Sequence, residues 1–409
     1  MSRYIKAGTG ISYNDNAYNA GYEAVKMAVK NIKSNPKFGV LFCSYKYAKN
    51  YSGLQKLVKA ANKAFGCKWI GCTTAGELSN FGATHGSCVA MAVTSDYIQA
   101  GTGYKNSVSK NPEKTTKQAL RSALHDITPD THITPYVQFM AYKNNPVKEL
   151  MQMHNFAIIT LTPGATKKYS SKDNSILSAL KDEIGGHVPI IGGAAGDDLN
   201  FEQTYQFANG LIFKDAVVIM PLSLSLKCSF GAAQGCTPTN RYFTVTSAKD
   251  NNVYTLNHLP AKGVYSELIG EDMAPFSIIG PEGRHWLRLP QSYEKDSLRF
   301  FSNVPENSTL TLMKPELKKT LNSAKNAILE NKPKNIKCMF IFESVARKKF
   351  LGKNTEKQFK NIKNIAGKAS FIGFNTYNEF GSSNSWSSGL LNYSLTSFTI
   401  EDNLITELK

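Results

Sequence analysis

The stretch "WIGCTTAGEL" (residues 69–78) places a glycine after an apolar run and an acid six positions beyond that glycine. Two later stretches repeat this arrangement, "IIGGAAGDDL" (190–199) and "FIGFNTYNEF" (371–380). The glycines are Gly71, Gly192 and Gly373, and the acids are Glu77, Asp198 and Glu379. Three copies with one spacing predict a structural unit that the chain uses three times.

Each copy belongs to the same predicted order of strand, helix, strand, loop and strand. Apolar runs at 38–44, 156–164 and 338–344 have the length of strands, and each precedes a segment with apolar residues at helical spacing. A helix between consecutive strands predicts a parallel pair, whereas the closing strand can run antiparallel. The sequence therefore predicts an α/β sandwich with mixed sheets built from this repeated unit.

The segment between the second and third units has a different pattern. "YFTVTSAKDNNVYTL" alternates like antiparallel strands, with residues 250–252 as the turn. No low-complexity linker separates the parts, and we predict a boundary near Pro221, with an N-terminal domain at 1–221 and a C-terminal domain at 222–409. No G-x-G-x-x-G or P-loop motif follows a predicted strand, which argues against a dinucleotide-binding fold.

Composition limits the classes of function. The chain has 409 residues, 42% of them apolar and 19% charged, which is typical of a globular protein. No apolar run approaches the roughly 18 residues of a membrane helix, and the first residues lack the apolar core of a secretory signal. We therefore expect a cytoplasmic protein without a membrane segment.

The net charge of +17 comes mainly from lysines spread along the whole chain. Nucleic-acid recognition favours clustered arginines and basic segments interleaved with aromatic residues, and neither pattern occurs. The seven cysteines are scattered and never spaced C-x-x-C. We therefore expect neither nucleic-acid binding nor a structural zinc site, and two neighbouring acids at 197 and 198 are more typical of a solvated loop than of a metal site.

The three loops have a structural interpretation. Glycine permits a positive φ or a close approach of another backbone. Gly76, Asp197 and Asn378 precede the three acids, and these residue types tolerate the left-handed region. Glu77 and Asp198 are interpreted as structural loop acids that accept hydrogen bonds from their own loops, whereas other polar groups accompany Glu379 and favour a functional role.

Several segments resemble the FIST family. "GTGISYNDNAYNAGYEAVKMA", "GCTTAGEL" and "PIIGGAAGDD" resemble the N-terminal FIST domain, and "FESVARKKFLG", "FIGFNTYNEFG" and "LLNYSLTSF" resemble the C-terminal FIST domain. The motifs occur in the order of the family and cover nearly the entire chain. A Gly-Glu pair is usual in the family where Asn378-Glu379 stands, and a small residue or cysteine is common before Arg347.

The resemblance implies an intracellular sensory module that binds a small ligand, amino acids being one proposal. Members of the family occur with histidine kinases, diguanylate cyclases and chemotaxis receptors, a subset binds haem and responds to nitric oxide, and a eukaryotic branch carries an F-box. Because the two predicted domains fill this sequence, we expect any signal to pass to a separate partner.

Five polar residues of the predicted C-terminal domain are the candidate ligand site. Arginine suits a carboxylate, so Arg347 is expected to bind either Glu379 or an acidic group of the ligand. The run "LLNYSLTSF" is predicted to be the closing strand of the third unit, and Asn392 is a polar residue on this otherwise apolar strand. Asn392 is either a satisfied core amide or a ligand contact. The predicted pocket is lined by Arg288, Arg347, Asn375, Glu379 and Asn392.

Two alternatives come from other classes of function. A haem-based sensor needs an axial ligand in an apolar cavity, and His154 and His285 lie nearest to apolar runs. An enzyme could use Cys72 or Thr73 as a nucleophile, but His85, the nearest histidine, has no recognisable partner. We expect a protein without catalysis of its own, with haem as the alternative cofactor.

Overall fold

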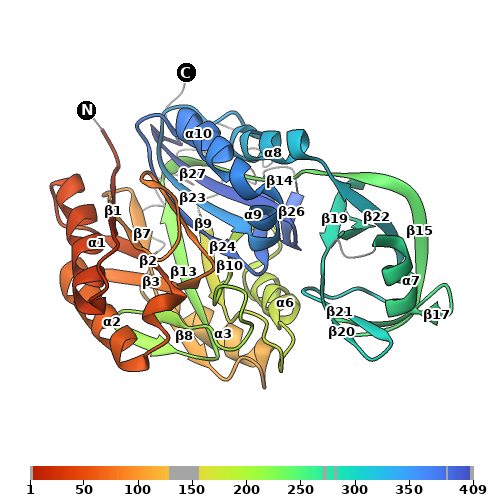
Figure 1. Ribbon diagram of the computed structural model, residues 1–409. Helices are drawn as coiled ribbons and strands as arrows, with labels where there is room; N and C mark the ends of the chain where they lie inside the picture. The colour runs from red at the N-terminus through yellow and green to blue at the C-terminus, as the bar shows by residue number, and fades with distance from the viewer. Residues whose placement is uncertain (1–2, 129–155, 270–273, 281–282, 384–385, 406–409) are drawn as a thin grey trace.

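The computed structural model describes residues 3–128, 156–269, 274–280, 283–383 and 386–405, and it has a mixed α/β fold. Three mixed sheets form the body, and a fourth sheet forms a lobe at one side (Figure 1). The predicted α/β class with mixed sheets is confirmed.

The three sheets of the body each join strands that are far apart in the sequence. The first has the order β1 (Lys6–Ser12), β6 (Cys88–Thr94), β2 (Phe38–Ser44), β3 (Lys68–Thr74), β11 (Gln206–Ala208) and β12 (Leu211–Phe213). The second has the order β26 (Trp386–Leu391), β25 (Glu379–Ser383), β10 (Ile190–Ala194), β9 (Phe156–Thr162), β13 (Ala216–Leu224) and β7 (Ile98–Ala100), and β8 (Gly103–Asn106) also pairs with β13. The third has the order β14 (Leu226–Gln234), β27 (Ser394–Leu404), β23 (Ile336–Ser344), β24 (Ser370–Thr376), β4 (Glu77–Ser79) and β5 (Gly82–Thr84).

The directions of the strands follow the prediction. In each predicted unit the first two strands are parallel, namely β2 with β3, β9 with β10 and β23 with β24. The closing strands β6, β13 and β27 pair antiparallel with the first strand of their unit. Each sheet thus has the same central arrangement.

The repeated glycines occupy one structural position. Gly71, Gly192 and Gly373 lie opposite Leu41, Thr160 and Ile341 on the neighbouring parallel strand. A Cβ atom added at any of the three glycines would collide with the carbonyl oxygen of the opposite residue. Close approach of two backbones therefore requires glycine at this point of all three strand pairs.

Hairpins are exchanged between the sheets. The hairpin β11–β12 of the second predicted unit pairs with β3 of the first, and β4–β5 of the first pairs with β24 of the third. The hairpin β25–β26 of the third unit completes the ring by pairing with β10 of the second. No sheet of the body is complete without a hairpin from elsewhere in the chain.

The inner faces of the three sheets share one apolar core. Phe42, Ile191 and Phe374 come from different sheets and belong to this core, and the rings of Phe42 and Phe374 lie 4.6 Å apart. The predicted boundary at residue 221 falls within β13, and the second and third sheets combine strands from both sides of it. The division into domains at that residue stays a prediction.

Helices cover the outer face of each sheet, as amphipathic patterns require. Asn16 caps the first helix by accepting a hydrogen bond from the Asn19 N–H, and Gly66 in the left-handed region ends the second. The covering pairs are α1 (Ala17–Ile32) and α2 (Tyr51–Phe65), α3 (Pro112–Leu124) and α6 (Asp173–Ile184), and α8 (Leu317–Leu329) and α10 (Thr355–Ala366).

The lobe has its own antiparallel sheet and its own apolar core, which includes Tyr265, Phe276 and Phe300. It contains β15 (Cys236–Lys249), β16 (Asn252–Leu256), β17 (Leu259–Pro260), α7 (Ala261–Ile269), β18 (Phe276–Ile279), β19 (His285–Arg288), β20 (Pro290–Glu294), β21 (Ser297–Phe300) and β22 (Thr309–Pro315). The predicted turn at 250–252 joins β15 to β16, and Asp250 there has a φ of 53°. Figure 1 shows the lobe standing apart from the three sheets, with β15 reaching into it from β14.

The run "LLNYSLTSF" differs from the prediction. It forms two strands, β26 and β27, instead of one, and Asn392 lies in the bend between them. Tyr393 has a φ of 55°, which reverses the chain there. The single strand predicted around Asn392 is wrong, because apolar content alone does not reveal a left-handed residue.

Candidate functional site

The three glycine-acid loops meet at one place in the body. Their backbones are joined by hydrogen bonds between each pair of loops. These bonds run from Ala75 N to Asn375 O (3.3 Å), from Asn375 N to Gly76 O (2.8 Å), from Ala194 N to Asn378 O (3.0 Å), from Tyr377 N to Ala194 O (3.2 Å) and from Gly196 N to Thr73 O (3.0 Å). The sequence-predicted loops therefore form a single junction among the three sheets.

Two of the loop acids have the same surroundings. The Glu77 carboxylate accepts hydrogen bonds from the Thr74 hydroxyl at 2.5 Å and from the Ser87 N–H at 3.2 Å. Glu379 accepts from the Thr376 hydroxyl at 2.7 Å and from the Ser394 N–H at 3.2 Å. Both side chains are fully buried, and burial raises the pKa of Glu77 to about 7 and the pKa of Glu379 to about 8.

The second loop is built differently. Asp197, and not Asp198, accepts hydrogen bonds from the backbone N–H groups of the residues at 201–203 and from the Tyr377 hydroxyl. Asp198 has a φ of 57° and lies 3.5 Å from the Nδ1 atom of His85, and burial raises its pKa. Gly76 has a positive φ, as predicted, whereas Asp197 and Asn378 do not, so the predicted equivalence is incomplete.

Arg347 lies on α9 (Val345–Leu351) and is fully buried. Its carboxylate partner is Glu343, four residues earlier, with Nε 3.2 Å from Oε1, and not Glu379. Its other N–H groups donate to the Ser323 hydroxyl (2.7 Å), the Thr320 carbonyl (3.2 Å) and the Gln358 side chain (2.8 Å). The guanidinium is thus bound by the protein itself.

The other predicted residues also lie in the interior. Asn375 donates to Glu343 Oε2 at 3.4 Å and so joins the network of Arg347. Arg288 donates to the carbonyls of Asn303 (2.8 Å) and Leu287 (2.9 Å), and burial lowers its pKa to about 10. The structure therefore brings Arg347 and Asn375 together around Glu343 but leaves Arg288 in the lobe.

Asn392 belongs to a different chain of hydrogen bonds. Its Nδ2 donates to Asn378 Oδ1 at 2.7 Å, and its Oδ1 accepts from the Leu289 N–H at 3.2 Å. Asn378 in turn donates to Asp173 Oδ2 at 2.7 Å. A buried line of amides therefore connects Leu289, directly after β19 of the lobe, with the first residue of α6.

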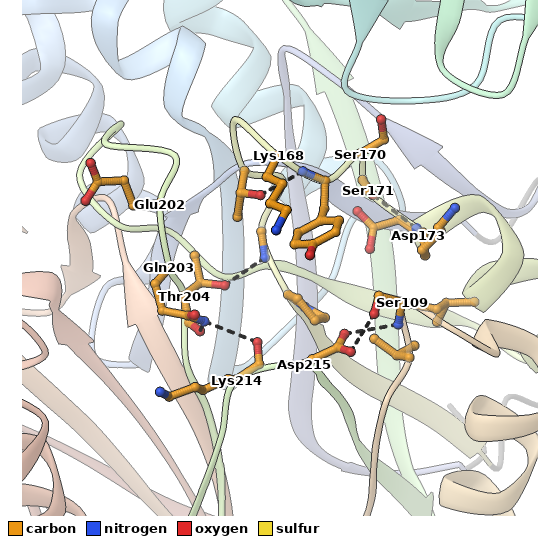
Figure 2. Close-up of a pocket in the computed structure, with 17 residues that line it drawn as sticks. Ser109, Lys168, Ser170, Ser171, Asp173, Glu202, Gln203, Thr204, Lys214 and Asp215 are labelled. Carbon is orange, nitrogen blue, oxygen red and sulfur yellow. Dashed lines mark hydrogen bonds between the residues drawn. The ribbon is translucent and has the colours of Figure 1, made fainter.

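Asp173 lies in the wall of a cavity of about 320 Å³ beside the first turn of α6. We name it the α6 cavity. It is lined by parts of segments 108–109, 163–176, 202–204 and 214–215, of which 163–176 begins where β9 ends. Figure 2 shows its labelled lysine, serine and aspartate side chains around the hollow. The carboxyl ends of parallel strands are the usual position of ligands in α/β proteins.

The charges of the α6 cavity are only partly compensated within the described residues. Asp215 accepts from the N–H and the hydroxyl of Ser109, and Glu202 pairs with Lys167 at 3.7 Å. Asp173 is buried and has one oxygen, Oδ1, without a hydrogen bond. Burial raises the pKa of Asp173 overall. The nearby Thr162 hydroxyl has a smaller effect, which lowers this pKa, but its geometry does not form a hydrogen bond with the Asp173 carboxylate.

The basic side of the α6 cavity consists of Lys168, Lys172 and Lys214. Lys168 lies over the ring of Tyr169 and Lys214 over the ring of Tyr51, and none of the three lysines has a carboxylate partner in the described part of the chain. The wall of the cavity thus contains a buried carboxyl group with one unpartnered oxygen, and three lysines without a carboxylate partner lie around it.

None of the five predicted ligand residues lines the α6 cavity. Asp173 and the lysines around it were not predicted as site residues from the sequence. A signal was present: "KKYSSKD" (167–173) concentrates charged and hydroxyl side chains directly after a buried strand. Because ligands bind at the carboxyl ends of parallel strands, this loop was predictable as a site.

The predicted nucleophiles are not assembled for catalysis. Burial raises the pKa of the Cys72 thiol well above its ordinary value, which opposes formation of a thiolate. The Thr73 hydroxyl accepts a hydrogen bond from the Tyr205 N–H, and the His85 side chain is 62% exposed beside Asp198. These groups form no nucleophile–base pair.

The haem alternative requires an axial ligand such as histidine in the wall of a cavity. His154 lies outside the described residues, and His285 forms a hydrogen bond of 2.9 Å with the Ser277 hydroxyl. No described histidine lines the α6 cavity, so the residues present do not fit a histidine-ligated haem there. In the described ranges, no three His, Cys, Asp or Glu side chains are grouped as a metal site, and no described helix has the length and apolarity to cross a membrane.

Comparison with known protein families finds two matching family models along the chain. The family model for the FIST N domain matches residues 37–259, and the FIST C domain matches residues 257–382. The chain belongs to the FIST family. Domains of this family are sensory modules of signal transduction, and the two FIST matches meet at 257–259, inside the lobe.

Individual relatives add little to the family assignment. An uncharacterized protein of Methanocaldococcus jannaschii, MJ1623, is 28% identical over an alignment of 174 residues, and the match covers 37% of this FIST chain and 34% of the relative. The match thus spans about a third of that protein's length. Among solved structures, a cyanuric acid hydrolase from A. caulinodans has a TM-score of 0.28 at 8% identity, covering 54% of this chain and 71% of its own. PurLQS from Thermotoga maritima has a TM-score of 0.20 at 10% identity, covering 97% of this chain and 72% of its own.

Proposed function

We propose that this protein senses a small amino-acid-like ligand in the cytoplasm and signals through a separate partner. The α6 cavity is the ligand site in this proposal, and a histidine kinase, a diguanylate cyclase or a chemotaxis receptor is the kind of partner expected. Membership of a sensory family supports the general role. The chemistry of the cavity supports the class of ligand.

The free oxygen of Asp173 carries the proposal. A buried carboxylate with an unused oxygen is costly unless a ligand or a proton satisfies it. A ligand ammonium group satisfies that oxygen and neutralises its charge, while Lys168, Lys172 and Lys214 attract the carboxylate of the same ligand. A zwitterion of amino-acid size suits a cavity of about 320 Å³.

The wall of the cavity also offers a route for the signal. The loop after β9 is held by the lobe, since Gln291 donates to the Thr166 carbonyl at 3.3 Å and Arg299 donates to the Lys167 carbonyl at 3.2 Å. Tyr169 and Lys168 of the same loop line the cavity. Because this loop is bonded to the lobe, a ligand that binds one position of the loop more tightly also favours the lobe position that goes with it. Only a difference in affinity between two conformations can shift the equilibrium between them.

The five residues predicted from the sequence have a supporting role in this proposal. Asn392 reaches Asp173 through Asn378, and the network of Arg347 holds α9 and α10 against the third sheet. The ligand contacts that we propose are made by the cavity residues instead.

A thermal-shift screen of the twenty amino acids with the full chain tests the proposal. We expect one amino acid to raise the melting temperature, since a ligand at a hundred times its Kd stabilises a protein by about 2.7 kcal/mol. Asp173→Asn should remove this shift. Asp182→Asn, on the same helix but paired with Lys117 outside the cavity, should keep it. A shift that survives Asp173→Asn, or no shift with any amino acid, would reject the proposed site.

A further inference from the structure

A second cavity, of about 760 Å³, lies where the lobe meets the body. We name it the junction cavity. Its lobe side includes Arg241 of β15 and Met313 of β22, and its body side includes Ala346 and Phe350 of α9 together with Tyr393. The two sides meet in one apolar cluster that contains Leu289 and Met313 of the lobe and Tyr393 of the body, so a ligand here would touch both.

Most of the junction cavity is apolar. Leu289, Leu312 and Met313 provide buried apolar surface, and Phe350 is an exposed aromatic side chain, 39% accessible, at its edge. Exposed aromatic groups beside a concave apolar wall are typical of ligand sites. The wall therefore suits an apolar molecular body.

The charged groups of the junction cavity all have one sign. Arg241, Lys314 and Lys349 line it, and no aspartate or glutamate does so among the described lining residues. None of these three side chains has an ion pair or hydrogen bond within the described parts of the chain. Three cations without an ion pair around an apolar wall attract an anion and disfavour an ammonium group.

Tyr393 adds a polar group at the same wall. Its side chain is only 3% exposed, and its hydroxyl has no hydrogen-bond partner among the described residues. The left-handed backbone of Tyr393 and its contact with the Phe350 ring, at 6.2 Å between centroids, set the position of the side chain. Burial raises its pKa, so the hydroxyl keeps its proton and can donate it in a hydrogen bond.

We propose that the junction cavity is a second ligand site, which binds an apolar anion: an aromatic or aliphatic body with one carboxylate or sulfonate group. The body packs against Leu312 and Met313, the anionic group is held by Arg241 and Lys349, and the Tyr393 hydroxyl donates to it. This site is separate from the α6 cavity, whose mixed charges suit a zwitterion.

The test is a fluorescence titration of the full chain with 8-anilinonaphthalene-1-sulfonate, an aromatic sulfonate whose emission rises in apolar surroundings. We expect saturable binding of one molecule per chain. Tyr393→Phe should weaken it about ten-fold, because a hydrogen bond to a charged group is lost. Arg241→Gln and Lys349→Gln should each weaken it about three-fold to five-fold, as expected for exposed charges.

Matched controls separate the cavity from general surface binding. Lys360→Gln changes an exposed lysine of α10, which does not line the cavity, and should leave the affinity unchanged. Ala346→Trp fills the cavity from α9 and should abolish binding, while an unchanged urea midpoint shows that the variant is folded. Octanoate should displace the probe, whereas octanol and glycine at the same concentration should not.

Three results would overturn the proposal: non-saturable binding, equal affinity in the folded Ala346→Trp variant, or equal displacement by octanol and octanoate. The first two would mean that the probe adsorbs elsewhere on the protein. The third would mean that the cations do not select an anion.

Discussion

Asn378 donates its side-chain amide to Asp173 over 2.7 Å, although 205 residues separate the two in the sequence. The same Asn378 accepts from Asn392 at 2.7 Å, and Asn392 accepts from the Leu289 N–H at 3.2 Å. Asp173 lines the α6 cavity and Leu289 lines the junction cavity. One short line of buried amides therefore joins the walls of the two cavities.

Asn378→Ala should lower the free energy of unfolding by about 1–3 kcal/mol, because Asp173 Oδ2 and the Asn392 amide both lose a buried partner. Urea denaturation at pH 7 measures the change. Asn19→Ala, at an exposed position of α1, is the matched control and should change stability by less than about 0.5 kcal/mol. Equal stability of the two variants would mean that the line of amides contributes nothing.

Arg347→Met should destabilise the protein by about 3–5 kcal/mol, because it leaves the Glu343 carboxylate buried without its charged partner. The double variant Arg347→Met with Glu343→Gln removes the unpaired charge and should recover part of the loss. Chemical denaturation of the two variants and the parent gives the comparison. If the double variant were less stable than Arg347→Met alone, the ion pair would not be the source of the effect.

The stability of the protein should fall as the pH rises from about 4.5 to 8. The pKa of Glu379 in the folded protein is about 8, so in this range the folded state holds a proton that the unfolded chain releases. The slope per group is at most about 1.4 kcal/mol per pH unit, and Glu77 adds to it up to about pH 7.

Glu379→Gln should flatten this dependence, as measured by urea unfolding at several pH values, whereas Glu356→Gln at an exposed position should not. A parent protein that gains stability between pH 5 and 8 would contradict the buried, protonated carboxyl.

Gly192→Ala should cost about 3 kcal/mol or prevent folding, because the methyl group collides with the Thr160 carbonyl and the backbone has a φ of 136°. Gly66→Ala is the matched control: its φ is 60°, but no other atom lies within 4 Å of an added Cβ, so only about 1 kcal/mol is expected. Soluble yield and melting temperature distinguish the two variants. Similar losses would show that backbone conformation matters here and the close approach of the strands does not.

The local part of this fold could be predicted from the sequence. The glycine spacing located the same close approach in three pairs of strands, and the strand at 38–44 matches β2 at both ends. The exchange of hairpins could not be predicted. The partner of β4 is β24, almost 300 residues later, and no residue near Glu77 specifies this pairing.

The candidate site could be predicted only in part. Arg347 and Asn392 stand out in the sequence as unusual polar residues, and both are buried. Their partners lie in contacts that no spacing specifies, apart from Glu343 four residues before Arg347. Asp173 was not predicted, because a carboxylate at the start of a helix is common. That one of its oxygens lacks a hydrogen bond is known only from the structure.

The exchanged hairpins also determine when the protein can fold. Asn80, beside the first hairpin, accepts a hydrogen bond from the Phe371 N–H, and the two residues are 291 positions apart. The ribosome releases β4 and β5 long before it makes β24, so the third sheet lacks its edge until almost the whole chain has been synthesised. Contacts of such long range slow folding and leave strand edges open to other chains in the meantime. Premature termination anywhere before β24 therefore leaves that early hairpin without its partner strand, which makes truncated chains prone to aggregation.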